Sequence, residues 1–229
     1  TITLGEGSTL DICDCSEDKT GKVGMSGNAS RGPVVLDGNK TINLYSGTLI
    51  GQMNSNTKQC VVMSHADARF NMYGGTITKG VSASYGGNVA VQKGVFTMYA
   101  GIISEGQATT HGGNVTASGG KFIMKGGQVS DGTATTYGGN ISFVTANSSG
   151  LLTGGSITGG TAGTYAACVY VNNNNVTVGG SVIVEEMMIA GGGKTVKVST
   201  EEAFVEGANI GLALQNAPTK YTTVISSFS

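Results

Sequence analysis

Apolar and polar residues alternate along this chain in short runs that recur at a fixed interval. The segment 85–110 reads YGGNVAVQKGVFTMYAGIISEGQATT, and the segment 111–136 repeats it almost position for position as HGGNVTASGGKFIMKGGQVSDGTATT. Each run ends at glycine or at a polar turn. A period of two in runs this short is typical of β-strands, and no stretch has helical spacing. Each unit is therefore predicted to hold about three short strands and three turns, with apolar positions such as Val89, Val91, Phe96, Met98 and Ile103.

The repeat continues on both sides of these two copies. Equivalent positions at Tyr85, His111 and Tyr137 lie 26 residues apart, and the next, Tyr165, follows after 28. Roughly six units align between about residues 32 and 186. Stacking such units places each strand beside its own copy, about 4.8 Å away, in parallel sheets whose crossovers favour right-handed winding. The predicted fold is an all-β, right-handed parallel β-helix of coils of about 26 residues with irregular end caps.

One domain is expected over residues 1–229. In it, residues 1–31 form an N-terminal cap coil, 32–186 the regular coils, and 187–229 the C-terminal coils and cap. Charge concentrates in the first of these segments and the repeat fades in the last, as expected where a solenoid must block edge-to-edge growth.

Stacking also turns columns of the repeat into ladders along the solenoid. Three interior ladders are predicted: Met72, Met98, Met124, Leu152 and Val178; Ile77, Ile103, Val129, Ile157 and Val182; and one that begins with Phe70, Phe96 and Phe122. An outward column, Thr76, Ile102, Gln128, Ser156 and Ser181, is too mixed for the flat threonine lattice of an ice-binding solenoid. The methionine column is interpreted as core packing and not as a cofactor site.

One corner column contains Cys60, Asn88, Asn114, Asn140 and Cys168. Asparagine suits such a corner because its amide can bond to the coils on both sides. Cys60 and Cys168 lie about four rungs apart, roughly 19 Å, too far for a disulfide. Cys13 and Cys15 point the same way if CDC is a strand, which is a poor geometry for a mutual disulfide. Free or buried thiols are expected, with a metal site at CDC as the less favoured alternative.

Composition excludes several classes of function. Charged residues make up 12% of the chain and the formal net charge is -1, so there is no basic field for nucleic acid or anionic lipid. Glycine, 39 of the 229 residues, is far above its usual share of roughly 7%, and its regular spacing marks corners, not a disordered linker. No apolar run is long enough for a membrane-spanning helix. We expect no cofactor, no metal, and no nucleic-acid or membrane contact by this segment.

The repeat unit GGN[VI]xV…F.MxGGxISxGxAT resembles repeats of large surface proteins of gut Firmicutes, which are similar to the right-handed β-helix of the pectate-lyase-like superfamily. The resemblance covers about two thirds of the chain. It implies an extracellular, cell-surface or cell-wall-attached domain of a larger adhesin-like protein. It also leaves open a carbohydrate-active enzyme, because the superfamily includes polysaccharide lyases and glycoside hydrolases as well as adhesins.

The acidic residues favour a structural role over a catalytic one. The central coils carry acids only at Glu105 and Asp131, one rung apart; a pair about 5 Å apart would fit a retaining glycosidase, but acids before glycine are ordinary in turns. A calcium site at Asp11, Asp14, Glu17 and Asp18 is less favoured than a solvated cap loop. The candidate ligand site is an aromatic column that could pack against sugar rings, although a half-buried stack that stabilises the solenoid is the favoured interpretation of the same residues: Tyr85, His111, Tyr137 and Tyr165.

The predicted function is a non-catalytic, extracellular β-helix domain of a bacterial surface adhesin-like protein. It would act as a spacer or contact a glycan or a host surface protein. The alternative is a carbohydrate-active enzyme of the same fold, with Glu105 and Asp131 as its acids.

Overall fold

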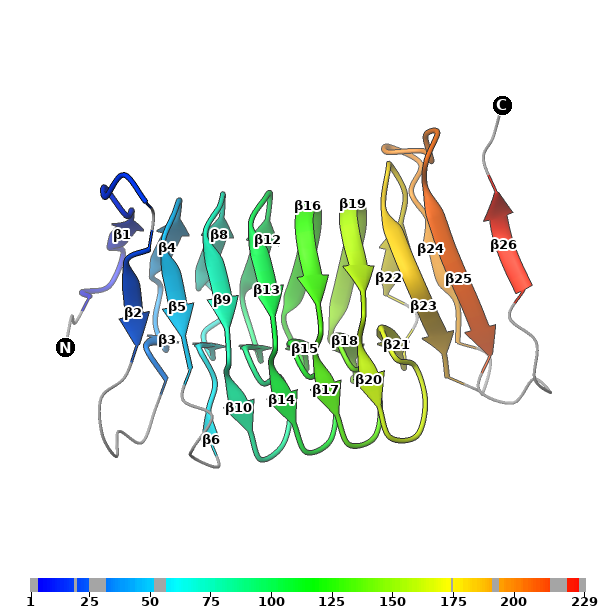
Figure 1. Ribbon diagram of the computed structural model, residues 1–229, viewed down its shortest axis with the longest axis horizontal. Coiled ribbons are helices and arrows are strands. Elements are labelled where there is room, and N and C mark those ends of the chain that lie inside the picture. The colour runs from blue at the N-terminus through cyan, green and yellow to red at the C-terminus, as the bar shows by residue number, and fades with distance from the viewer. Residues whose placement is uncertain are drawn as a thin grey trace.

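The strands of this protein stack coil on coil into a parallel β-solenoid of about 7 turns (Figure 1). The structure, a computed structural model, describes residues 4–18, 20–24, 32–51, 57–173, 175–190, 194–214 and 222–226, and within these ranges every regular element is a β-strand. The predicted all-β parallel solenoid with a spacing of about 26 residues is confirmed. Right-handed winding stays a prediction from the chirality of parallel crossovers.

Three faces enclose the core, and each is built from one strand of every coil. Face A contains β3 (Val34–Leu36), β7 (Val61–Met63), β11 (Val89–Val91), β15 (Val115–Ala117), β18 (Ile141–Phe143) and β21 (Val169–Val171). Face B contains β1 (Thr9–Ile12), β4 (Thr41–Leu44), β8 (Arg69–Met72), β12 (Val95–Met98), β22 (Val176–Val178) and β24 (Val196–Val198). Face C contains β2 (Lys22–Gly24), β5 (Thr48–Ile50), β9 (Thr76–Thr78) and β13 (Ile102–Ser104).

Four long strands turn a corner and so belong to two faces. In β16 (Lys121–Ser130) and β19 (Ser149–Thr158) the first half pairs on face B and the second half on face C. In β23 (Ile183–Ile189) and β25 (Asn209–Leu214) the first residues continue face C and the last continue face A. Parallel pairing already begins at β1 and β2, which pair with β4 and β5, and at the other end β26 (Thr222–Ser226) runs antiparallel to β25.

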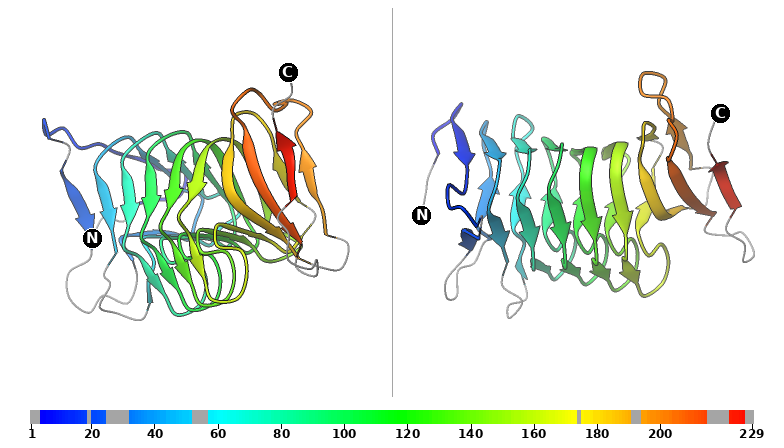
Figure 2. Two further views of the ribbon diagram at one scale, coloured as in Figure 1. Left: turned by 45° about the vertical axis from the view of Figure 1, so that its right-hand side comes forward. Right: turned by 45° about the horizontal axis from the view of Figure 1, so that its top comes forward.

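A fourth strand per coil, which the sequence pattern did not predict, builds a separate small sheet. Its members are β6 (Thr57–Lys58), β10 (Val81–Ser82), β14 (Gln107–Ala108), β17 (Thr133–Ala134) and β20 (Thr161–Ala162). With the loops that follow them, residues 81–87, 107–113, 133–139 and 161–167 form a ridge along one side of the solenoid, which we call the flange (Figure 2). The prediction of about three strands per coil is therefore wrong for the central coils. A two-residue strand is too short to produce an apolar period.

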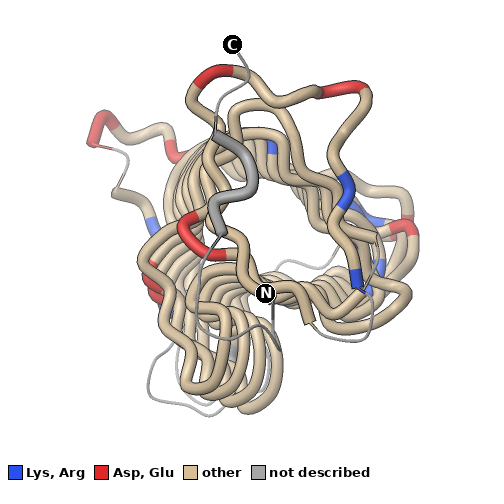
Figure 3. The backbone as a smooth tube through the Cα atoms, turned by 90° about the vertical axis from the view of Figure 1, so that its right-hand side faces the viewer, with Lys and Arg blue, Asp and Glu red and all other residues tan. Residues whose placement is uncertain are grey.

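The flange folds over the outside of face A. From β11 to β21, outward-facing side chains of this face are nearly as buried as inward ones: Thr116 is 1% exposed, Ser142 0% and Tyr170 5%. Thr116 Oγ1 donates to the His111 carbonyl at 2.9 Å, and Ser142 Oγ donates to the Tyr137 carbonyl at 3.2 Å. Viewed along the axis, the flange forms the lower-left lobe beside the ring of three faces, and it carries no charged residue (Figure 3).

The interior ladders are confirmed with one correction. Met72, Met98, Met124, Leu152 and Val178 pair in successive coils and are buried, as are Phe70, Phe96 and Phe122. The isoleucine ladder, however, continues from Ile157 to Val184 and not to Val182, and the outward column continues from Ser156 to Ile183 and not to Ser181. The corner after Val178 has one residue more than in the preceding coils, whereas the expected ladder gave it one residue fewer, so the expected register is wrong by two residues there.

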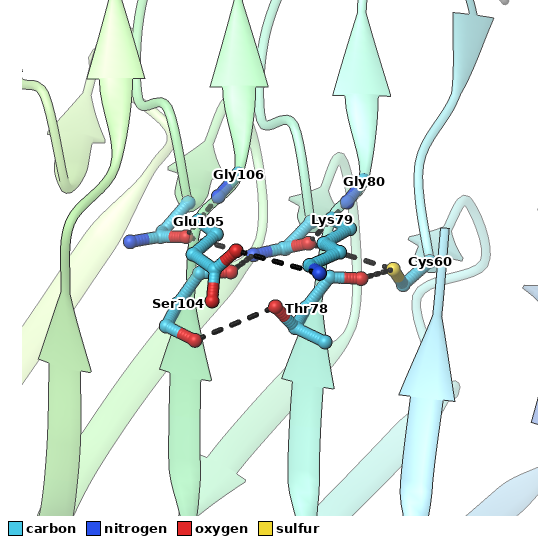
Figure 4. Close-up of polar contacts among 9 residues, drawn as sticks. Cys60, Thr78, Lys79, Gly80, Ser104, Glu105 and Gly106 are labelled. Carbon is cyan, nitrogen blue, oxygen red and sulfur yellow. Dashed lines mark hydrogen bonds and ion pairs between the residues drawn. The ribbon is translucent and has the colours of Figure 1, made fainter. Parts of the chain in front are cut away.

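The asparagine corner is confirmed. Asn88 Nδ2 donates to Asn114 Oδ1 at 2.7 Å, and Asn114 Nδ2 donates to Asn140 Oδ1 at 2.8 Å. Each Oδ1 also accepts from the glycine that opens the flange strand of its own coil, as Asn114 does from Gly106 N at 2.9 Å. At the N-terminal end Cys60 Sγ lies 3.5 Å from Asn88 Oδ1 and 3.3 Å from the Thr78 carbonyl (Figure 4). The buried polar ladder is thus hydrogen-bonded from coil to coil.

Candidate functional site

The predicted aromatic column lies on the flange, one ring per coil. Parallel bridges join Tyr85 to His111, His111 to Tyr137, and Tyr137 to Tyr165. The ring centroids of these pairs are 5.2, 5.1 and 6.0 Å apart, with interplanar angles of 10°, 19° and 3°. Tyr170, on the covered side of face A, adds a fifth ring 4.5 Å from Tyr137. The structure therefore brings together all four predicted site residues.

This stacking decides which ring surfaces a ligand can reach. Rings stacked at about 5 Å cover one another's flat faces, so the inner members His111 and Tyr137 offer mainly edges. Both are half-buried, whereas the end members Tyr85 and Tyr165 are 41% and 42% exposed. A sugar that packs its C–H face on a ring can do so only at an end of this column. The column is thus an internal stack in its middle, and its end rings are its most exposed members.

A shallow pocket of about 220 Å³ opens at the Tyr85 end. It lies between the flange on one side and the outward residues of face A on the other. None of the nine described residues that line it carries a charge, and seven of them have a polar side chain: Gln59, Ser82, Ala83, Ser84, Tyr85, Ala90, Gln92, Thr116 and Ser118. Only Tyr85 among them was a predicted site residue.

Several polar groups of this pocket have hydrogen-bonding capacity to spare. Ser82 Oγ accepts from Ser84 N at 3.2 Å and retains its own proton. Gln59 Nε2 donates to the Tyr85 carbonyl at 2.6 Å, which leaves Gln59 Oε1 as an acceptor. Within the described part of the chain, the side chains of Tyr85, Gln92 and Ser118 have no hydrogen-bond partner. The pocket thus offers donors and acceptors beside one exposed aromatic face.

His111 is the polar member of the stack. Its Nδ1 is buried and has no hydrogen-bond partner, and burial lowers the pKa of its imidazole. The ring is therefore neutral at physiological pH. It stacks beneath Tyr85 as an uncharged aromatic.

A second aromatic column, which the sequence analysis did not single out, lies at the corner between faces B and C. Tyr45, Tyr73 and Tyr99 stack with centroids 5.0 and 4.9 Å apart and interplanar angles of 11° and 5°. They are 46%, 41% and 42% exposed. The signal was present in the aligned repeats as a tyrosine directly after the Leu or Met that ends three successive face B strands, β4, β8 and β12.

The acids Glu105 and Asp131 occupy equivalent turns of adjacent coils, as predicted, since Ser104 pairs with Ser130 just before them. Both have left-handed backbone, with φ of 55° and 56°, and both side chains are exposed. Glu105 faces Lys79 of the preceding coil, with 3.8 Å between Nζ and Oε2 (Figure 4). A glycosidase acid normally sits in an enclosed site that tunes its proton affinity. An exposed turn offers no such enclosure.

The acidic loop near the N-terminus binds its own backbone. Asp14 accepts from Gly21 N at 2.6 Å and from Ser16 N at 3.0 Å, and Asp18 accepts from the hydroxyl of Thr20 at 2.9 Å. That hydroxyl, first among several hydrogen bonds, lowers the pKa of Asp18. Asp11, just before this loop in the chain, accepts from Asn43 Nδ2 at 2.7 Å. Over the described ranges, no group of three or more His, Cys, Asp or Glu side chains is arranged to hold a metal ion.

All four cysteines are free, as predicted; Cys13 and Cys15 are exposed, while Cys60 and Cys168 are buried. Burial raises the pKa of the Cys60 thiol to about 12, and burial also raises the pKa of Cys168. At pH 8 a thiol of pKa 12 is ionised in about one molecule in ten thousand.

Alkylation of the native protein by iodoacetamide at pH 8 is therefore expected to label Cys13 and Cys15 at least about 100-fold faster than Cys60 and Cys168. Peptide mass spectrometry of timed samples measures the four rates. The unfolded protein in urea is the control, in which all four sites should react alike. Fast labelling of Cys60 in the folded protein would contradict its place at the end of the asparagine corner.

Comparison of the chain with protein-family models, with curated proteins and with solved structures gives no match. In the residues that the structure describes, no helix is long and apolar enough to span a membrane. The resemblance to surface proteins and to the pectate-lyase-like superfamily therefore rests on the repeat motif alone.

Proposed function

We propose that this chain is a non-catalytic, extracellular β-solenoid domain of a larger adhesin-like bacterial surface protein, and that its flange binds a glycan. The solenoid acts as a rigid spacer that presents the flange along one side. We also propose that the solenoid winds right-handed and is related to the pectate-lyase-like superfamily. The protein is located at the cell surface or cell wall and comes from a gut bacterium.

The observation that carries the proposal is the pocket at the end of the flange stack. It combines an exposed tyrosine face, free hydroxyl and amide groups, and no charge. Sugars present this pair of surfaces, an apolar C–H face and a rim of hydroxyls, and binding sites commonly match them with one aromatic plane and a few polar side chains. The carbohydrate-active enzyme alternative has less support, because Glu105 and Asp131 lie outside this pocket and in exposed turns.

Binding of the purified domain to an array of plant and mucin glycans tests the proposal. Tyr85→Ala is expected to weaken binding about tenfold or more, because the sugar loses its stacking plane. Tyr99→Ala is the matched control. Tyr99 is 42% exposed and stacks on one ring at 4.9 Å, but it lies at the corner between faces B and C, away from the flange. Equal losses in both folded variants, or no glycan bound by the unaltered domain, would overturn the proposal. The second outcome would favour a protein partner.

A further inference from the structure

The pocket beside Tyr85 has a size, a position and a chemistry that restrict its ligand further. We propose that it holds one uncharged sugar residue at the end of a glycan and rejects a residue that carries a carboxylate. This inference rests on the proposed glycan binding by the flange. It adds the class of sugar and the way in which the chain is held.

Size limits the ligand to one ring. The pocket measures about 220 Å³, whereas sites for larger organic ligands span roughly 300–1,000 Å³. Its floor and far wall come from two adjacent coils, through Ala90 and Gln92 of one and Thr116 and Ser118 of the next. With Gln59 from the preceding coil, the lining extends over three coils, roughly 10 Å along the axis. The small volume, and not this span, limits the ligand to a single sugar ring.

Position makes the bound residue a terminal one. On the ladder side, His111 stacks on Tyr85 at 5.2 Å and closes off that face. Farther along the flange the equivalent space is filled, because Ser142 is fully buried and the Tyr137 ring packs on Tyr170 at 4.5 Å. No continuous channel follows the flange, so a polysaccharide cannot lie along it with one ring per coil. An end residue inserted beside Tyr85 fits the space that is left.

The side chains that line the pocket disfavour a charged ligand. The groups free to bond the ligand are the amides of Gln59 and Gln92 and the hydroxyls of Ser82, Tyr85 and Ser118. They match the alternating donors and acceptors of sugar hydroxyls. No lining residue is a cation, so a carboxylate that entered would lose hydration without gaining an ion partner. Burying a charge that has no counter-ion costs far more free energy than burying a neutral hydroxyl that has a hydrogen-bond partner.

The test compares matched glycans that differ only in their terminal residue: a galactose- or glucose-terminated oligosaccharide, and the same core ended by sialic or glucuronic acid. Isothermal titration should show at least tenfold tighter binding of the neutral-ended glycan. Gln92→Lys introduces a cation into the wall and should reduce that preference by tenfold or more. Gln128→Lys, on the exposed side of face C and outside the flange, adds the same charge and should leave the preference unchanged.

The outcomes separate the two proposals. Glycan binding that is lost in Tyr85→Ala but shows no preference for neutral ends, or favours acidic ends, would overturn the inference and leave the proposed function standing. Tight binding of internal chain segments without free ends would also overturn it. If the unaltered domain binds neither the neutral nor the acidic glycans, both the inference and the proposed function fail.

Discussion

Replacing Asn114 by alanine is expected to lower the free energy of unfolding by about 3–5 kcal/mol. Asn114 is fully buried at the middle of the corner ladder and takes part in four hydrogen bonds. Its Nδ2 donates to the Ser130 carbonyl at 2.7 Å and to Asn140 Oδ1 at 2.8 Å. Its Oδ1 accepts from Gly106 N at 2.9 Å and from Asn88 Nδ2 at 2.7 Å.

Alanine would remove one hydrogen bond from each of the four partners of Asn114, inside a corner that has little room to rearrange. Each unsatisfied buried group costs about 1–3 kcal/mol, and some recover part of this through water or through their other bond. Three coils are affected at once, because Asn88 and Asn140 belong to the coils on either side. Equilibrium unfolding in urea, followed by far-UV circular dichroism, measures the loss. If Asn114→Ala does not yield folded protein, Asn114→Ser, which keeps one donor and acceptor, should give an intermediate loss.

Asn71→Ala is the matched control for this prediction. Asn71 also bonds to an asparagine of the neighbouring coil, with 2.9 Å between its Nδ2 and Asn43 Oδ1, but on the outer side of face B where water competes. Its loss is expected to cost less than about 1 kcal/mol. Similar losses for Asn71 and Asn114 would show that burial of the corner ladder contributes nothing beyond an ordinary surface hydrogen bond.

The second large effect is expected inside the core, where the large aromatic side chain lies on face B in one coil and on face A in the next. The phenylalanine ladder of face B continues from Phe122 to Gly150, which has no side chain. The ring of Phe143, on face A of the same coil, fills that space: a Cβ added to Gly150 would lie 2.5 Å from two of its ring carbons. In the preceding coil the sizes are reversed, with Ala117 opposite Phe122.

Phe143→Ala should therefore destabilise the protein by about 3–5 kcal/mol, because it leaves a ring-sized cavity beside a glycine. Gly150→Phe alone should prevent folding or cost several kcal/mol, since two rings cannot share the space. The double variant reproduces the arrangement of the preceding coil and should recover most of the loss in Phe143→Ala. Urea unfolding of the four proteins gives the coupling energy, expected to exceed about 2 kcal/mol in the stabilising direction. Additive effects would contradict this packing.

The inward-facing positions were predictable because the repeat is a direct record of them. Each ladder residue is buried in every coil, so the same kind of side chain recurs at the same place, as Met72, Met98 and Met124 do. The prediction was wrong at Val182, where the corner after Val178 gained a residue. An alignment of repeats places such an extra residue by similarity alone. The register is decided by which residue can reach the core after the corner.

The candidate site was only partly predictable for a related reason. The aromatic column was visible because its members recur, and the structure brings Tyr85, His111, Tyr137 and Tyr165 into one stack. The pocket was not visible, because Gln59, Gln92 and Ser118 do not recur at equivalent positions of other coils. The column Tyr45, Tyr73 and Tyr99 did recur and could have been found by the same criterion.

The sequence by itself determined that this protein is a parallel β-solenoid with asparagine at one corner, because a periodic chain can bury its apolar positions only by stacking equivalent residues. The tertiary structure alone decided that the central coils form a flange and that the flange covers face A. It also decided that the large ring lies on face B at Phe122 and on face A at Phe143 in the next coil. It also decided that only the end rings of the aromatic stack have a free face. These features depend on contacts between different columns of the repeat, whereas a periodic pattern records only the contacts within one column.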